Sequence, residues 1–128
     1  MQERIVNPRD GIYRTTPDYV HALEVSGVTR QLYVSGTIGL QADGTAPKDL
    51  DDQLRLIWSN IRRILKDADM TTDNIVRVTS YLTDASFTER NQDARLKALG
   101  NRRVPATAIV VETLDPSWLV EIEVIAVG

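Results

Sequence analysis

Residues 50–68 have the sequence LDDQLRLIWSNIRRILKDA, and residues 74–83 have the sequence NIVRVTSYLT. In the first stretch, apolar side chains recur at steps of four, three, four, four and three from Leu50 to Ala68. This spacing predicts a helix with one apolar face. The second stretch is rich in β-branched and aromatic residues, which favours a strand whose one face carries Ile75, Arg77, Thr79 and Tyr81. A long amphipathic helix followed by a strand predicts a domain in which helices pack on a sheet.

The chain before this helix favours short strands and turns. Residues 19–25 and 31–35 have the composition of strands, and residues 36–40 are expected to continue the second one. The short turn at 26–29 predicts that these two strands pair as an antiparallel hairpin. Residues 1–17 are polar and interrupted by proline and glycine, so we expect an arm or a loosely paired edge there.

The chain after residue 83 favours one more helix and two more strands. Ser86, with Glu89 three residues later, matches a capping box, so a second helix is expected to begin at Ser86. Gly100 and the residue after it should end this helix near Leu99. Residues 106–113 and 119–127 favour strands.

The predicted order of elements defines a fold class. Two helices and a mixed sheet give a two-layer α+β domain with both helices on one face of the sheet. The length of 128 residues suits a single domain, residues 1–128. One layer of helices leaves the other sheet face uncovered, although that face carries apolar side chains. These are Leu119, Ile125, Val127, Ile109 and Val111. The uncovered face therefore predicts self-association.

The composition excludes several function classes. With no cysteine and a single histidine, His21, the chain cannot form a disulfide scaffold, a thiolate metal site or a multi-histidine metal site. The 15 basic and 18 acidic residues give a net charge of −3, which argues against a dedicated nucleic-acid binder. No apolar run approaches the ~20 residues of a membrane span. The N-terminus also lacks an apolar leader segment, so we expect a cytoplasmic protein.

Two carboxylates are the strongest candidates for chemistry. Glu121 and Glu123 are two residues apart on a predicted strand, so both point to the same side. Two interpretations stay open: a solvated edge or ion pair, or a carboxylate in an apolar cleft with a pKa raised enough for proton transfer. Other candidates share polarity or backbone accessibility but no specific motif. They are Tyr19, His21, Ser35, Gly36, Asn91, Thr107, Ile109 and the pair Arg102-Arg103.

Together these segments resemble a known family. The blocks that carry the resemblance are VSGTIG at 34–39, QLRLIWSNI at 53–61, NIVRVTSYLTD at 74–84, VPAT at 104–107 and VEIEVIA at 120–126. In their order and spacing the chain resembles the RidA/YjgF family of enamine and imine deaminases from about Tyr19 to the C-terminus. The resemblance implies a chorismate-mutase-like fold and a homotrimer with small-molecule sites in the clefts between subunits. It also implies hydrolysis of a C=N group with release of ammonia, without metal or organic cofactor.

The resemblance assigns roles to individual positions. Glu121 matches the glutamate that orients water and transfers protons. The positions that match substrate-binding residues are Tyr19, Ser35, Gly36, Asn91 and Ile109. One position departs from the pattern, because Thr107 stands where deaminating members have an arginine that binds the substrate carboxylate. Threonine has neither the charge nor the two-pronged geometry of a guanidinium. This substitution makes activity on ordinary 2-imino acids doubtful unless Arg102 or Arg103 replaces the missing charge.

The resulting hypothesis is a trimeric hydrolase acting on the imine or enamine group of a small metabolite, with Glu121 activating water. A non-catalytic, ligand-binding or regulatory trimer of the same fold is the alternative, and the missing arginine favours it. Endoribonuclease activity is a third interpretation, opposed by the acidic charge and by an aromatic content of 5%.

Overall fold

A computed structural model describes residues 1–128 of the protein. The elements follow the chain in the order β1 (Gln2–Val6), β2 (Ala22–Ser26), β3 (Gln31–Ile38), α1 (Leu50–Asp67), β4 (Ile75–Leu82), α2 (Thr88–Ala98), β5 (Ala106–Val110) and β6 (Val120–Val127). Short 3-10 turns at Thr72–Asn74 and Ala85–Phe87 lead into β4 and α2.

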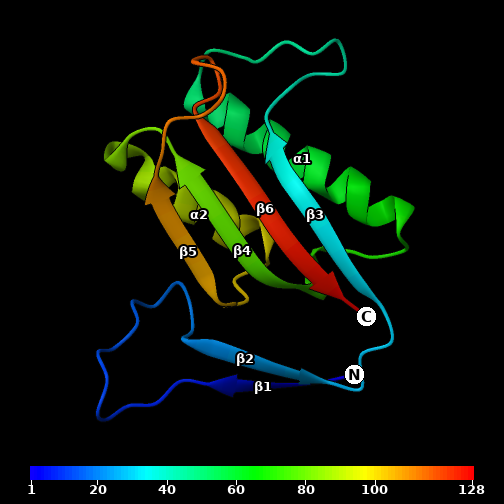
Figure 1. Ribbon diagram of the computed structural model, residues 1–128, viewed down its shortest axis with the longest axis vertical. Helices are drawn as coiled ribbons and strands as arrows, with labels where there is room; N and C mark the ends of the chain where they lie inside the picture. Colours follow the sequence, from blue (N-terminus) through cyan, green and yellow to red (C-terminus); the bar gives the residue numbers. More distant parts are fainter.

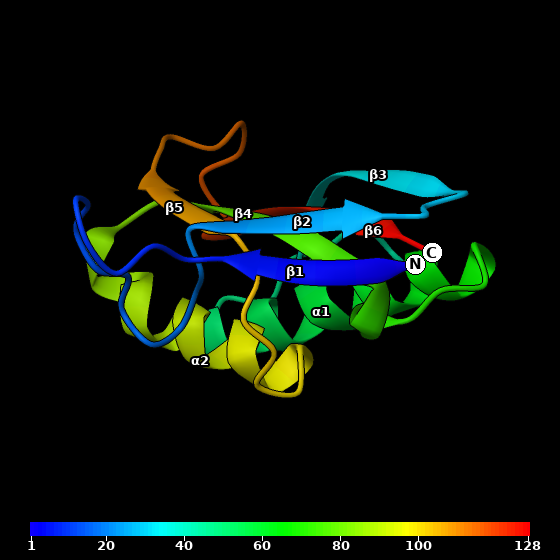
Figure 2. The ribbon, with the colours of Figure 1, turned by 90° about the horizontal axis from the view of Figure 1, so that it is seen from below.

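The main sheet has four strands in the order β3-β6-β4-β5. β6 pairs antiparallel with both β3 and β4, whereas β4 and β5 run parallel, so the sheet is mixed. Figure 1 shows the four strands side by side, and Figure 2 shows α1 and α2 together on one face. The expected two-layer α+β fold is confirmed.

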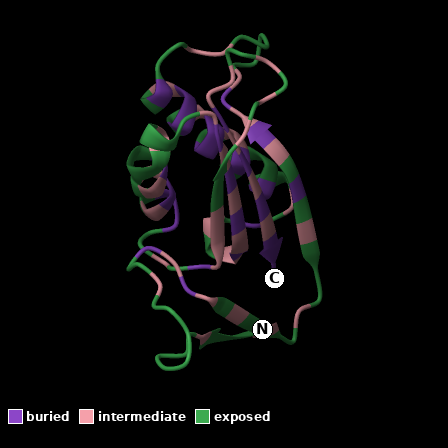
Figure 3. Cartoon of the chain, turned by 60° about the vertical axis from the view of Figure 1, so that its left-hand side comes forward, coloured by how far each residue is buried: buried purple, intermediate pink, exposed green.

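The core lies between the helices and this sheet. Asp49 caps α1 by accepting a hydrogen bond from the backbone N–H of Asp52 at 3.2 Å, which satisfies one free donor of the first turn. The stripe residues Ile57, Ile61 and Leu65 are fully buried. Every second residue of β6 is buried as well, from Val120 to Ala126 (Figure 3). Its intervening residues, including both glutamates, therefore point to the face without helices.

The predicted hairpin between residues 19–25 and 31–35 is wrong. β2 pairs with β1, in a register that joins Gln2 to Ser26, and β3 pairs with β6. The two-stranded sheet β1-β2 lies beyond one end of the main sheet (Figure 1). Closeness in sequence favours a hairpin, but pairing with β6 lets β3 bury Val34 in the core.

Three local predictions also need correction. Ser86 does not cap α2, because Asp84 caps the preceding 3-10 turn by accepting a hydrogen bond from the backbone N–H of Ser86. A register shift between Ile75 and Arg77 turns the side chain of Ile75 into the core, where it is fully buried, so it does not share the face of Arg77. Val127, expected on the uncovered face, is buried too.

A buried ion pair holds the segment that leads into β2. The Nη2 atom of Arg95 on α2 lies 2.6 Å from Oδ2 of Asp18, and both side chains are at most 10% exposed. Burial alone would raise the pKa of Asp18, but hydrogen bonds from Thr16 and Arg95 outweigh it and hold the pKa below its usual value. The charge pair therefore anchors the N-terminal segment to the helical layer.

Candidate functional site on the open face of the sheet

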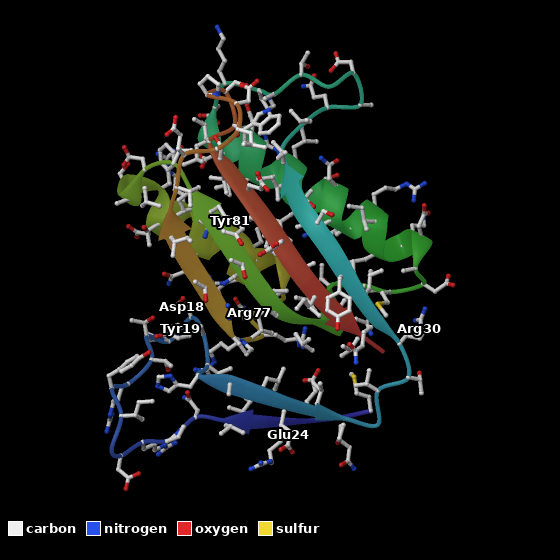
Figure 4. All side chains as sticks on the ribbon, viewed as in Figure 1. Asp18, Tyr19, Glu24, Arg30, Arg77 and Tyr81 are labelled. Carbon is white, nitrogen blue, oxygen red and sulfur yellow. The ribbon has the colours of Figure 1, made fainter.

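We call the sheet surface opposite the helices the open face. Partners in neighbouring strands share a face, so the register defines rows of side chains across it. One row joins Glu121, Tyr81 and Ile109, and the next joins Glu123, Thr79 and Thr107. A third row joins Tyr33, Ile125 and Arg77. Figure 4 labels Tyr81 and Arg77 at different heights of β4.

A β-bulge brings the Ser35-Gly36 backbone to Glu121. The pairing of β3 with β6 shifts between Val34 and Thr37, so Ser35 and Gly36 together oppose one residue of β6. The Glu121 side chain lies over Gly36, because a Cβ atom added there would come within 2.7 Å of the Glu121 Cδ atom. A larger residue at this position would displace the Glu121 side chain, whereas the backbone itself is in the common φ range.

The two glutamates of β6 have different environments. The Oη atom of Tyr81 donates a 2.5 Å hydrogen bond to Oε1 of Glu123. This bond, with partial burial and the nearby charges of both glutamates, raises the pKa of the Tyr81 hydroxyl. The carboxylate of Glu121 has no hydrogen bond or ion pair with any residue of the chain. Of the pair, Glu121 is thus the carboxylate free to bind water or a ligand.

Thr107 and Ile109 lie on β5 at the other side of β4. Thr107 is half-buried and accepts a 2.6 Å hydrogen bond from Nη2 of Arg77. Ile109 is 47% exposed and shares its row with Glu121. The open face therefore brings together five of the seven predicted site positions, Glu121, Ser35, Gly36, Thr107 and Ile109, on three strands.

The other two predicted positions lie elsewhere in the same chain. Asn91 is buried in α2, on the helical side of the sheet, and its Oδ1 atom has no hydrogen-bond partner. Tyr19 precedes β2 and is labelled near the start of β5 in Figure 4, with its ring edge-to-face against His21 at a centroid distance of 6.4 Å. Within one protomer, neither side chain joins Glu121 on the open face.

The two arginines considered as replacements for the missing charge point elsewhere. Arg102 donates to the carbonyl oxygens of Thr72 and Ile75 at 3.1 and 3.2 Å, and its Nη2 atom is 3.4 Å from Glu3. These bonds hold the start of β4 and the N-terminal strand. Arg103 is exposed and forms no ion pair. The cation that does lie on the open face is Arg77. From the sequence, Arg77 was predicted on the same strand face as Thr79, but it was not predicted to belong to the site.

The comparisons with known proteins define the class of protein. The family model described as endoribonuclease L-PSP matches residues 13–128. A RutC family protein of Aquifex aeolicus is 34% identical over 113 residues, which cover 85% of this chain and 87% of the relative. A RutC family protein of Pyrococcus horikoshii is 30% identical over 97 residues, covering 74% of this chain and 77% of the relative.

Solved structures agree with these sequence relatives. A Rid-family protein of unknown function from Yersinia pestis, YyfB, has a TM-score of 0.85 at 25% identity, with complete coverage of both chains. A second Yersinia pestis protein of that family, YyfA, has a TM-score of 0.72 at 27% identity, over 99% of this chain and 100% of the other. The chain belongs to the RidA/YjgF family, as its sequence predicted. Neither of its helices is long and apolar enough to span a membrane.

Proposed function

We propose that the protein is a single-domain hydrolase that removes ammonia from an imine or enamine group of a small metabolite. The observation that carries this proposal is the free Glu121 carboxylate, seated over Gly36 on the open face. A carboxylate without a protein partner can bind and deprotonate water. The other two side chains in the row of Glu121 offer an apolar contact (Ile109) and a hydroxyl group (Tyr81).

The reaction needs one water and one carboxylate. Glu121 accepts a proton from water as the oxygen bonds to the C=N carbon and the π electrons move to nitrogen, and Glu121 then gives this proton to the nitrogen. A carbinolamine results. Glu121 then helps transfer the hydroxyl proton to the amine, the C–N bond breaks, and a carbonyl and ammonia leave. Atoms balance as imine plus water giving carbonyl plus ammonia, so no metal or organic cofactor is required of this step.

Assembly completes the proposed site. The open face leaves Tyr33 69% and Ile109 47% exposed, which is much apolar surface for an isolated sheet. We place this face in a homotrimer, with ligand clefts between subunits. Tyr19, which is remote from Glu121 within one chain, would then line the cleft of a neighbouring subunit. Asn91 is buried, and its role in the site rests on the family resemblance alone.

The test is ammonia release from imines and enamines generated in solution, half of them with a carboxylate beside the C=N group and half without. We expect Glu121→Gln to lower turnover by about 10²–10⁴-fold, the usual contribution of a positioned acid-base group. Glu123→Gln, on the same strand and face, should have a smaller effect, and the exposed Glu112→Gln serves as a surface control. Size-exclusion chromatography and circular dichroism would verify that each variant keeps the assembly and fold of the wild type.

One observation favours a second candidate function. Thr107 stands in place of the family arginine, and without that group the site could bind a ligand without turning it over. If the folded wild-type protein releases no ammonia from any substrate of the panel, this binding function is favoured. The description of the matching family model also names an endoribonuclease. Salt-dependent RNA binding and cleavage would support that activity, and their absence at low salt would exclude it.

A further inference from the structure

Arg77 is the one open-face cation, and no acidic residue forms an ion pair with it. It is half-buried on β4 and takes part in no ion pair. The only hydrogen bond of its side chain within the protein uses Nη2, which donates to Oγ1 of Thr107 at 2.6 Å. A guanidinium has five N–H donors, so most of them remain available. A partly desolvated arginine without a counter-ion is suited to bind an anion.

A hollow beside Arg77 can receive such an anion. It has a volume of about 330 Å³ and lies on the open face over β3, β6 and β4. Its walls include the side chains of Tyr33, Thr79, Ile125 and Glu123, together with Arg77. Glu123 is the only acidic group among them, and its Oε1 atom is held by Tyr81. No ion pair joins Glu123 to Arg77, so the guanidinium is not occupied by this carboxylate.

We infer that Arg77, held by Thr107, binds a substrate carboxylate that lies several bonds away from the C=N group. This inference rests on the proposed function, because it names the substrate class of the same face. Thr107 does not replace the family arginine as an anion ligand. It is a positioning residue, and the charge comes from the neighbouring strand.

The register determines the separation between Arg77 and Glu121. Arg77 lies two rows from Glu121 along β4, on the strand next to β6. With about 3.4 Å per residue along a strand and 4.8 Å between strands, the two backbone positions are roughly 14 Å apart. Hydrogen bonds of about 3 Å to the anion and to a water on Glu121 take up only part of this separation. A 2-imino acid, whose carboxylate is one bond from the C=N carbon, is too short to fill the rest, so the carboxylate is expected several bonds away.

The experiment separates anion binding from turnover. Binding of butanoate and of its neutral analogue butanamide would be titrated by NMR against the wild type, Arg77→Gln, Arg77→Lys and the exposed control Arg103→Gln. We expect Arg77→Gln to weaken butanoate binding by about 10- to 100-fold, the range for losing a charged hydrogen bond. Arg77→Lys should fall in between, because it keeps the charge and loses the bidentate geometry. Butanamide binding and the Arg103→Gln variant should match the wild type.

Turnover then tests the spacing. Ammonia release from 4-iminobutanoate should exceed release from 2-iminobutanoate. With the first of these substrates, Arg77→Gln should raise KM without a matching fall in kcat. Thr107→Val, which removes the anchor and keeps the charge, should raise KM by a smaller factor. Melting temperatures of all variants would show that they are folded.

The outcomes distinguish this inference from the proposed function. Butanoate binding that is equal in wild type and Arg77→Gln would overturn the anion site, whatever the activity. A preference for 2-iminobutanoate would overturn the spacing. If no substrate releases ammonia but butanoate binding still depends on Arg77, the proposed hydrolysis fails and the anion site stands.

Discussion

Two glycines of β3 and the loop after it allow the site geometry to be tested by adding one methyl group. At Gly36 an added Cβ would lie 2.7 Å from Cδ of Glu121, which is the flexible end of a side chain. At Gly39 it would lie 2.6 Å from the carbonyl oxygen and 2.9 Å from Cα of Gln53, which belong to the backbone of α1. Neither glycine has a positive φ, so alanine is conformationally allowed at both.

The two substitutions should therefore affect different properties. In Gly36→Ala, Glu121 can rotate away at a cost of about 0.5–1.5 kcal/mol for an unfavourable rotamer. The reduced entropy of the unfolded chain returns roughly 0.4–1 kcal/mol, so the net change in unfolding free energy should be close to zero. In Gly39→Ala, the backbone of α1 cannot move without repacking, and we expect a loss of about 1–3 kcal/mol.

Activity should show the reverse order. To reach ordinary van der Waals contact at 3.4 Å or more, Cδ of Glu121 must move outward from 2.7 Å, and its carboxylate oxygen must move further. A displacement of about 1 Å at a reacting group costs on the order of 10²-fold in rate. Gly36→Ala should lose about this factor in ammonia release, while Gly39→Ala should keep its activity at temperatures where it remains folded.

Urea unfolding followed by fluorescence and the ammonia assay measure the two effects. The control is the double variant Gly36→Ala/Glu121→Ala, in which the added methyl meets no carboxylate and should cost no stability relative to Glu121→Ala. The reasoning is refuted if Gly36→Ala destabilises the protein as much as Gly39→Ala does. It is also refuted if Gly36→Ala leaves an active enzyme at the wild-type rate.

Three further predictions concern buried and hydrogen-bonded groups. Burial raises the pKa of Asp18, but hydrogen bonds from Thr16 and Arg95 outweigh it and lower the pKa, so the resulting stabilisation is present above about pH 3.9 and is lost as the pH falls through the folded-state pKa. The difference in unfolding free energy between wild type and Asp18→Asn should therefore shrink as the pH is lowered, and a constant difference would contradict the ion pair. Gln53 is fully buried, and its side chain forms hydrogen bonds of 2.7–2.9 Å with three backbone groups. Gln53→Leu should therefore lower the unfolding free energy measured by urea titration by about 3 kcal/mol or more, and a loss below about 1 kcal/mol would argue against these bonds. The hydrogen bond to Glu123 raises the pKa of the Tyr81 hydroxyl. In an ultraviolet pH titration, one tyrosine of Glu123→Gln should therefore ionise at lower pH than in the wild type, and identical titration curves for the two proteins would exclude the bond in solution.

The faces on which several site residues lie could be predicted from the sequence. The alternation in β6 placed Glu121 and Glu123 on one face, and the structure confirms this because a strand has a strict period of two. The same rule placed Thr107 and Ile109 together on β5. These predictions needed only local backbone geometry, which the residue pattern determines.

Long-range pairing was harder to predict. The hairpin expected between residues 19–25 and 31–35 does not form, because β3 gains a buried partner in β6, the last strand of the chain. The face assigned to Ile75 was wrong because a bulge depends on the partner strand as well as on the residue itself. Local propensity carries no information about either partner.

The sequence by itself determined the helix stripe of α1, the alternation of β4 and β6 apart from Ile75 and Val127, the two-layer class and the family. Each of these depends on periodicity or on ordered motifs. Only the tertiary structure decided which glutamate is free, because Tyr81 reaches Glu123 from another strand. It also decided that Arg77 meets Thr107, a contact between residues 30 positions apart. Side chains on different strands become neighbours only through the sheet register, and the register is settled by burial of the whole core.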